Sequence, residues 1–399
     1  MEAYLDNSAT TKIDEDVLAL MERVYKEDFG NPSSRHKKGM EAERYLKTAK
    51  EQIAATLKCK PEELFFTSGG TESNNMALIG AALANKRSGM HIITTAFEHP
   101  SVYEPLFFLE ELGFRVTYLT PGPEGTVTVE ALKEVLSQDT ILVSVMAVNN
   151  EVGAVQDITA LGAAVKAYNP AILFHVDAIQ AYGKFRIYPK RQNIDMLSVS
   201  AHKLHGPKGC GFLYVKEKTK IKPILHGGGQ QKGMRSGTEN VPGIAGTGLA
   251  AELAASKIEA LQEHLFELKK YFAEGLSKLS DVTIHLVDNE DGTPVSPEER
   301  ESRLKRTAPH IMSVGFLGVR SEVLLHALEE KGIYVSSGSA CSSNHPAVSG
   351  TLKAIGVKKE LLDSTVRFSF CGETTKEELE HTLKVLEELL PQLRRFFRK

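Results

Sequence analysis

The sequence predicts an α/β protein in two parts. The larger part is built on a mostly parallel sheet with helices on both faces, and the smaller part is of the α+β type. Between residues 64 and 215, seven short apolar segments alternate with helical patterns, which is the order that parallel strands and crossover helices require. The chain has 399 residues, of which 42% are hydrophobic, and this is enough for one large and one smaller core.

Two helices are expected before the sheet begins. The chain starts extended over residues 5–11 and enters a first helix at about Asp14. A break at 29–34, which contains Gly30 and Pro32, separates it from a second amphipathic helix between about Met40 and Leu57.

The seven strand-like segments follow in chain order. Because only a short turn that contains glycines separates the last two, we expect one edge strand to run antiparallel. The segments are 64–67, 91–95, 115–119, 141–146, 172–176, 196–200 and 212–215.

A long helical pattern over 241–279 then leaves the sheet. Strands near 282–286, 311–316 and 366–370 follow, with helices near 321–331, 347–355 and 375–394, and they predict the smaller α+β part. We therefore assign 14–259 to the larger domain, and 1–13 with 260–399 to the smaller one. Residues 288–307 are almost all polar or charged and predict a solvated, disordered insertion without a catalytic role.

Composition narrows the class of protein. A net charge of −3 argues against a nucleic-acid binder, which is usually basic. The four cysteines form no CxxC pair and have no metal-ligand spacing, so we expect a reducing compartment and neither a disulfide framework nor a metal. The N-terminus lacks the features of a signal peptide and no apolar run could span a bilayer, which predicts a cytoplasmic protein.

Lys203 is the first candidate for chemistry. It follows a predicted buried strand that ends at Ser200, and a Gly-Pro-Lys-Gly turn comes soon after it. Open α/β sheets bind ligands at such strand ends. Burying a lysine is costly, so Lys203 is either an ordinary surface residue, the commoner case, or a desolvated amine that forms a Schiff base with a carbonyl compound such as pyridoxal phosphate.

Two further strand ends carry polar residues. Gly70 and Thr71 join a strand to a helix, where backbone N–H groups and a hydroxyl either bind a phosphate or form an ordinary helix cap. Asp177 ends the strand before that of Lys203, so the two side chains are expected to project from neighbouring strands. Its carboxylate either pairs with a cation, for example a protonated pyridine nitrogen, or caps a helix.

Four other residues have both a chemical and a structural interpretation. His99, at another strand end, either stacks on a flat cofactor and moves protons or belongs to a turn. The amide of Asn150 bonds a phenolate or carboxylate, or holds a turn. Cys341 lies in a small, polar segment and is either a reactive thiol or an inert surface cysteine. Arg367, on a strand, grips a substrate carboxylate or pairs with a structural acid.

Taken in order along nearly the whole chain, these segments resemble the pyridoxal-phosphate cysteine desulfurases of the NifS/IscS type, in the class-V aminotransferase family. Each motif alone is weak, whereas the ordered set is specific. The matching segments are 5–11, 29–34, 67–73, 98–99, 148–151, 175–178, 200–203, 226–229, 234–238, 336–343 and 366–369.

The resemblance implies the fold-type I architecture of pyridoxal-phosphate transferases, a homodimer, and a set of roles around the cofactor. Lys203 would form the Schiff base with pyridoxal phosphate. Asp177 would pair with its pyridinium nitrogen, Gln180 would bond its phenolic oxygen, and His99 would stack on its ring and serve in acid–base steps.

The same resemblance assigns the phosphate to the loop at Gly70 and to Thr71, Ser200 and His202, with Thr238 reaching in from the partner subunit.

Asn150 and Arg367 would orient the substrate carboxylate, and Cys341 would accept the sulfur. The implied reaction converts L-cysteine to L-alanine and leaves a persulfide on Cys341, for iron–sulfur cluster assembly or tRNA thiolation.

Two alternatives stay open: a related lyase or aminotransferase, such as a selenocysteine lyase, and a non-catalytic module of an assembly complex. The 288–307 insertion and the short C-terminus depart from the family pattern, so the sulfur-acceptor protein, an iron–sulfur scaffold or another, stays open.

Overall fold

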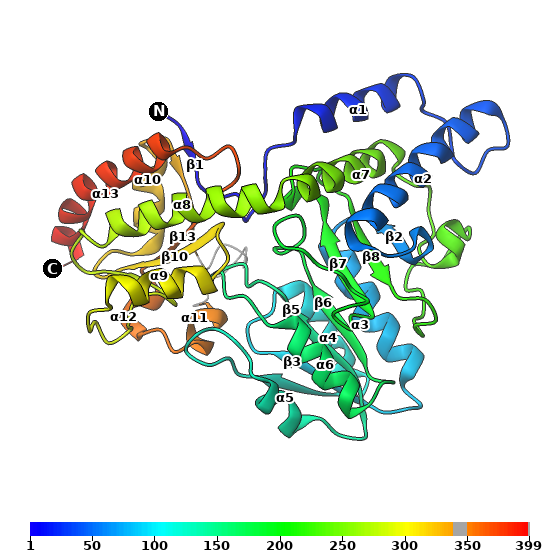
Figure 1. The fold of residues 1–399 in the computed structure, drawn as a ribbon, viewed down its shortest axis with the longest axis horizontal. Helices are drawn as coiled ribbons and strands as arrows, with labels where there is room; N and C mark the ends of the chain where they lie inside the picture. The colour runs from blue at the N-terminus through cyan, green and yellow to red at the C-terminus, as the bar shows by residue number, and fades with distance from the viewer. Residues whose placement is uncertain (338–348, 398–399) are drawn as a thin grey trace.

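Seven strands form the larger sheet of the computed structural model, which describes residues 1–337 and 349–397 (Figure 1). In spatial order they are β2 (Leu64–Thr67), β8 (Gly211–Val215), β7 (Met196–Ser200), β6 (Leu173–Asp177), β5 (Thr140–Met146), β3 (His91–Thr95) and β4 (Arg115–Leu119). This confirms the predicted α/β class with a mostly parallel seven-stranded sheet, and every predicted strand exists to within a residue or two.

The antiparallel strand is not where the sequence placed it. Strand β8 runs antiparallel to β7 and also to β2, which lies outside it. The short turn after β7 does force β8 to run antiparallel, as expected. Its free edge is then covered by β2, which comes from a distant part of the chain, so β8 lies one position inside the sheet rather than at the edge.

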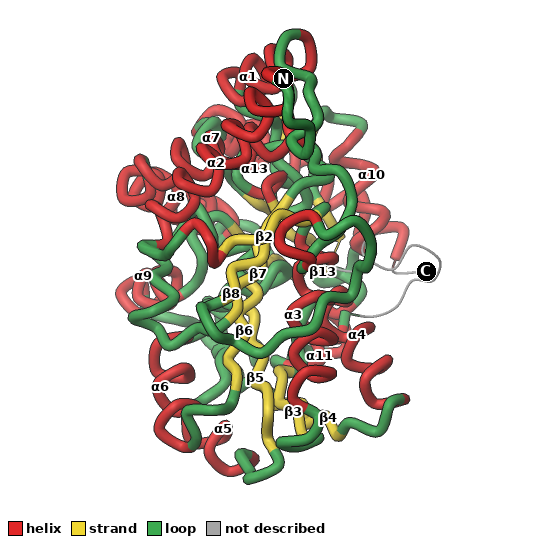
Figure 2. The backbone as a smooth tube through the Cα atoms, turned by 90° about the vertical axis from the view of Figure 1, so that its right-hand side faces the viewer, coloured by secondary structure: helices red, strands yellow, loops and turns green. Residues whose placement is uncertain are grey.

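Helices cover both faces of this sheet (Figure 2). On one face lie α3 (Gly70–Asn85) and α4 (Pro100–Glu111), whose apolar side chains pack on those of the strands. On the other face lie α2 (Lys37–Leu57), α5 (Val129–Val135), α6 (Ile158–Tyr168) and α7 (Val241–Ser256). Because both faces are covered, β3, β5, β6, β7 and β8 are buried along their whole length, as is usual for a sheet with helices on both faces.

The first helix, α1 (Glu15–Lys26), begins where the sequence predicts. The Asp14 carboxylate accepts a hydrogen bond from the backbone N–H of Asp16 at 2.9 Å and caps the helix. Acidic residues occupy its first turn and basic residues its last, which matches the helix dipole.

A second sheet and its helices form the smaller part, at the left of Figure 1. Its four antiparallel strands, in spatial order, are β12 (Ser336–Ser337), β13 (Thr365–Ser369), β10 (Ile311–Phe316) and β9 (Val282–Ile284). A separate parallel pair joins β1 (Ala3–Tyr4) to β11 (Ile333–Tyr334). The helices are α8 (Ile258–Leu276), α9 (Pro297–Arg306), α10 (Ser321–Glu329), α11 (Gly350–Ala354), α12 (Lys359–Leu362) and α13 (Lys376–Phe397).

One apolar cluster in this part contains residues from both ends of the chain. Leu5 packs in the same cluster as Phe272 of α8 and Phe368 of β13. The two aromatic rings meet edge to face, with centroids 5.0 Å apart. The assignment of 1–13 and 260–399 to a smaller domain, and of 14–259 to a larger one, stays a prediction.

Two sequence predictions about this part were wrong in detail. The long helical pattern over 241–279 forms two helices, because Lys257 leaves the helical conformation (φ −121°, ψ 6°) between α7 and α8. The insertion at 288–307 contains helix α9, which Ser296 caps and in which Leu304 is buried. A good cap and one buried leucine stabilise a helix even where the rest of the segment is charged.

Among the helices of the described residues, none is long and apolar enough to cross a bilayer.

Candidate active site

The carboxyl ends of β6 and β7 lie side by side and form the floor of the site. Asp177 is the last residue of β6, Ser200 is the last residue of β7, and the two strands pair in parallel. A short 3₁₀ turn, Ala201–Lys203, then carries Lys203. The sequence prediction that Asp177 and Lys203 come from neighbouring strand ends is confirmed.

Asp177 is a buried carboxylate, with 2% of its surface exposed. It accepts hydrogen bonds from Nδ2 of Asn74 at 2.8 Å and from the backbone N–H of Ile179 at 2.9 Å. Burial raises the pKa of Asp177, whereas these hydrogen bonds and the positive charge of Lys203 act in the opposite direction. A buried acid in this situation favours a cationic partner nearby.

Asn74, on α3, is a site residue that the sequence analysis missed. Its amide nitrogen donates to Asp177 and also to Oγ of Ser101 at 2.9 Å, while its buried Oδ1 has no partner among the described residues. The sequence could have pointed to Asn74 because it is a polar residue in α3 shortly before the apolar stretch of that helix. This stretch begins at Met76. Such a residue on a buried helix face usually bonds something specific.

His99 caps helix α4 and faces the same carboxylate. Its Nδ1 accepts a hydrogen bond from the backbone N–H of Ser101 at 3.1 Å, so the hydrogen of the neutral ring lies on Nε2. Burial lowers the pKa of His99, and the charge of Lys203 lowers it further, against the opposite effect of Asp177. His99 is therefore neutral near pH 7 and presents an N–H group.

Glu98, beside His99, received no role from the sequence. Its carboxyl is buried and accepts hydrogen bonds from Oγ1 of Thr95 at 2.6 Å and from the backbone N–H of Met146 on β5 at 2.9 Å. Burial raises the pKa of Glu98 to about 8. At neutral pH the side chain is therefore a protonated acid that ties the His99 loop to the neighbouring strand.

This burial predicts a pH-dependent stability. The folded protein keeps the proton on Glu98 up to about pH 8, whereas an unfolded chain releases it near pH 4.5. Between these values the folded state binds more protons, so the free energy of unfolding should fall by about 1.4 kcal/mol per pH unit from this group as pH rises. The Glu98→Gln variant, which resembles the protonated acid, should lack this slope. Urea unfolding of both proteins at pH 6 and 8 measures it, and equal slopes would contradict the assignment.

The amine of Lys203 contacts the N-terminal segment. It donates hydrogen bonds to the backbone carbonyl oxygens of Ser8 and Ala9, the latter at 2.7 Å. Nε2 of Gln180 donates to the same Ser8 oxygen at 2.9 Å, and the buried Oε1 of Gln180 has no partner in the part of the chain that the structure describes. Gln180 and Lys203, both selected from the sequence, therefore donate hydrogen bonds to the same backbone oxygen.

A site for an anion lies at the N-terminus of α3. Gly69 has φ +146°, which an L side chain rarely adopts, and a Cβ on Gly70 would come within 2.1 Å of Cδ1 of Ile179. Among residues 1–337 and 349–397, no side chain bonds to the N-cap position of this helix. Thr71 is exposed in its first turn, and Oγ of Ser200 lies close to Gly69. Free N–H groups and hydroxyls in this arrangement bind phosphates.

His202 and Thr238 are less closely tied to this site. Nδ1 of His202 lies 3.1 Å from Oγ1 of Thr10, and burial lowers the pKa of His202 to about 4. Thr238 is exposed on the segment that leads to α7. Nearby, Nε of Arg235 donates to Glu72 of α3 at 2.8 Å. A contribution of Thr238 from a partner subunit stays a prediction.

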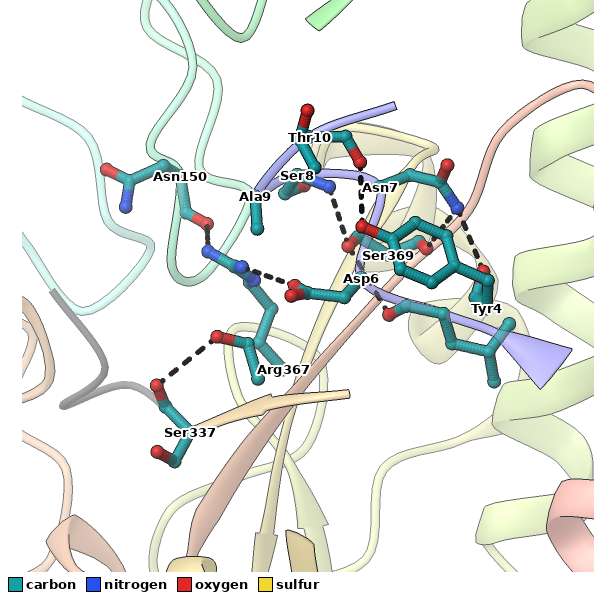
Figure 3. A network of polar contacts seen from close by, with 12 residues as sticks. Tyr4, Asp6, Asn7, Ser8, Ala9, Thr10, Asn150, Ser337, Arg367 and Ser369 are labelled. Carbon is teal, nitrogen blue, oxygen red and sulfur yellow. Dashed lines mark hydrogen bonds and ion pairs between the residues drawn. The ribbon is translucent and has the colours of Figure 1, made fainter. Parts of the chain in front are cut away.

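Arg367 projects from β13 and is buried, with 7% of its surface exposed (Figure 3). Its guanidinium donates to the backbone oxygen of Asn150 at 2.9 Å and forms an ion pair with Asp6 at 2.7 Å. Figure 3 shows the side chain of Asn150 pointing away from Arg367. These two bonds use two of the five guanidinium N–H groups, so three remain for a carboxylate.

The segment of residues 6–10 connects the two halves of the site, a role that the sequence analysis did not recognise. Asp6 holds Arg367, the carbonyl groups of Ser8 and Ala9 hold Lys203, and Thr10 contacts His202. Cys341 lies outside the described residues. The chain reaches it from β12, which pairs with β13 so that Ser336 lies opposite Arg367.

Comparisons with known proteins agree with this geometry. The aminotransferase class-V family model matches residues 3–382. The cysteine desulfurase IscS of Dictyoglomus turgidum is 44% identical over 98% of this chain and 95% of its own length. A solved NifS-like protein superposes with a TM-score of 0.90 and 38% identity, over 98% of this chain and 100% of the other. The structure of SspA in complex with cysteine has a TM-score of 0.78 and 32% identity, over 94% and 100%. The chain therefore belongs to the class-V aminotransferase family and, within it, to the cysteine desulfurases of the NifS/IscS type.

Proposed function

We propose that this protein is a pyridoxal-phosphate cysteine desulfurase, which removes sulfur from L-cysteine, releases L-alanine and holds the sulfur as a persulfide on Cys341. The observation that carries the proposal is that Asp177 and Lys203 meet at neighbouring strand ends and that His99, which follows β3, lies near both. Residues 6–10 link this group to the buried Arg367. The names of the relatives and the cysteine bound by SspA support the choice of substrate.

The residues of the site fit pyridoxal phosphate. Asp177 forms no ion pair with any described residue, and Asn74 and Gln180 each have a buried oxygen to which no described residue bonds. No described side chain caps the N-terminus of α3, so its first backbone N–H groups are suited to bind an anion. When bound, the cofactor supplies an aldehyde that condenses with amines and a ring that withdraws electrons from the attached carbon.

We assign each polar group of the cofactor to residues of this chain. Asp177 would hold the pyridine nitrogen in its protonated form, Gln180 would bond the phenolic oxygen, and His99 would cover the ring. The residues that would hold the phosphate are Gly70, Thr71, Ser200 and His202, with Thr238 of the partner subunit. Lys203 provides the amine that binds the cofactor covalently.

Arg367 and Lys203 act directly on the substrate. Arg367 binds the carboxylate of cysteine with its remaining N–H groups, and Asn150 fixes the guanidinium through its backbone oxygen. The Nζ atom of Lys203 would act as the base that removes the proton from Cα of the substrate. His99 would offer its Nε2–H to the bound substrate or cofactor as a hydrogen-bond donor.

The sulfur then passes to the enzyme. A thiol has a pKa of about 8.5, so Cys341 must first lose its proton to attack. Its thiolate attacks the sulfur of the substrate, an S–S bond forms, the C–S bond breaks, and the carbon takes up a proton to give alanine. L-Cysteine and the Cys341 thiol thus become L-alanine and a persulfide, without any external oxidant.

We further propose a cytoplasmic homodimer that passes the persulfide sulfur to an acceptor protein, either an iron–sulfur scaffold or a partner in tRNA thiolation. A reducing compartment suits the three described cysteines, none of which is in a disulfide with another described residue.

One experiment tests this function. The purified protein should show the visible absorbance of bound pyridoxal phosphate, and addition of L-cysteine should change the spectrum while alanine and, with a reductant, sulfide appear in equal amounts. A colourless protein that does not take up the cofactor would indicate a non-catalytic module. Turnover of selenocysteine without turnover of cysteine would indicate a selenocysteine lyase instead.

Arg367→Leu should raise the KM for L-cysteine with a smaller effect on kcat. Loss of a charge-assisted bond to the substrate carboxylate costs about 1.5–3 kcal/mol, which corresponds to an increase of about 10- to 100-fold. Arg367→Lys keeps the charge but not the two parallel bonds, and should give an intermediate value. Because Arg367 also pairs with Asp6, thermal unfolding of both variants must be measured alongside. An unchanged KM would place the substrate carboxylate elsewhere.

A further inference from the structure

A cavity of about 420 Å³ lies beside the turn that carries Lys203, and Lys203 is one of its lining residues. Its walls come from the N-terminal segment, from the junction of α7 and α8, and from the chain after β13. Most of the lining is apolar, for example Leu253, Leu261 and Phe370, but the side chain of Lys184 also faces it. Lys184 has no part in the cofactor and substrate contacts proposed above.

The amine of Lys184 bonds directly to the backbone of Lys203. Its Nζ donates to the carbonyl oxygen of Lys203 at 2.8 Å. In the part of the chain that the structure describes, no carboxylate lies within ion-pair distance of this amine. Burial and, to a lesser degree, the charge of Lys203 lower the pKa of Lys184 to about 7. A partly buried amine without an acidic partner costs stability, so packing alone does not account for it.

The backbone of Lys184 is fixed on both sides. Its N–H donates to the carbonyl oxygen of Ala181 at 3.0 Å, and its own oxygen accepts a bond from Nε2 of Gln262 on α8 at 2.7 Å. Gly183, just before it, has φ +78° and allows the sharp turn. The side chain therefore leaves from a rigid turn, which follows β6 and is the same one that carries Gln180.

We propose that Lys184 is a positioning residue for Lys203: its amine holds the main-chain carbonyl of Lys203 and fixes the turn from which Lys203 reaches the cofactor. This inference rests on the proposed function, because it assigns Lys184 to the covalent step of that same site. Lys184 connects three elements around this turn, namely the end of β6, the end of β7 and helix α8.

The test measures how fast Lys203 binds the cofactor, independently of turnover. Each cofactor-free protein is mixed with pyridoxal phosphate, samples are reduced with borohydride at intervals, and mass spectrometry follows the modified peptide that contains Lys203. Lys184→Met removes the donor but keeps most of the stem, and should slow this attachment by about tenfold. Lys184→Arg keeps a cationic donor and should recover most of the rate. Lys257→Met, in the same cavity wall but exposed, is the matched control and should leave it unchanged.

Two results would overturn the inference. One is attachment by Lys184→Met at the wild-type rate. The other is an equally slow Lys184→Arg, which would mean that only the shape of the lysine side chain matters. If Lys184→Met does not fold, Lys184→Gln, whose shorter side chain lacks the cation, replaces it. The same two results would then overturn the inference. A wild-type protein that is never modified at Lys203 would instead refute the proposed function itself.

Discussion

Replacing Lys203 with alanine is expected to abolish covalent attachment of pyridoxal phosphate and to lower the rate of alanine formation from cysteine by at least about 10³-fold. In the proposed mechanism the amine has two tasks, to bind the cofactor and to remove the Cα proton, and loss of a group with both tasks is rarely compensated. The measurements are the visible spectrum and the alanine assay.

The matched control for Lys203→Ala is Lys208→Ala. Lys208 lies five positions later in the same Gly-Pro-Lys-Gly region but is exposed. This variant should keep both the spectrum and the turnover. Since the Lys203 amine also bonds to the carbonyl groups of Ser8 and Ala9, thermal unfolding of Lys203→Ala separates a folding defect from a chemical one. A Lys203→Ala protein with the wild-type spectrum would remove Lys203 from the mechanism.

Replacing Cys341 with alanine is expected to leave the cofactor spectrum intact and to eliminate persulfide and sulfide formation. The three other cysteines are poor candidates for the nucleophile because burial disfavours their thiolates. Burial raises the pKa of Cys59 to about 12 and that of Cys210 to about 11, and it also raises the pKa of Cys371. The chain has four cysteines in all, so Cys341 is the remaining one.

The control for Cys341→Ala is Cys371→Ala, because Cys371 lines the cavity next to Lys203. That variant should retain persulfide formation. Persulfide on the protein is measured by alkylation after a single turnover with cysteine, followed by mass spectrometry of the peptides. Sulfur found on Cys371, or turnover that survives Cys341→Ala, would contradict the assignment of the acceptor thiol.

The two variants also separate the two halves of the reaction. Lys203→Ala stops the reaction before the substrate is activated, whereas Cys341→Ala stops it only when sulfur must leave carbon. If both variants lost the cofactor, the second would have acted through the fold, and thermal unfolding would show it. A clean separation supports the order of steps proposed above.

The sequence by itself determined the order of the elements and selected the residues that we propose for the chemistry. Strand lengths and crossover helices follow from local periodicity, which neighbouring residues encode. They placed Asp177 and Lys203 on adjacent strand ends, where the structure has them. The beginning of α1 at Asp14 was equally local, since a cap bonds only to the residues that follow it.

Only the tertiary structure decided the contacts between residues far apart in the chain. Asp6 and Arg367 are separated by 361 positions and still form an ion pair. Asn74 of α3 bonds to Asp177 of β6, and β8 pairs with β2, which comes much earlier in the chain. No local pattern encodes such pairs, because they depend on how strands align and how helices pack on the finished sheet. The hydrogen bond from the amine of Lys184 to the backbone of Lys203 is another contact of this kind. The surrounding fold, and not the residue type, gives Lys184 its position.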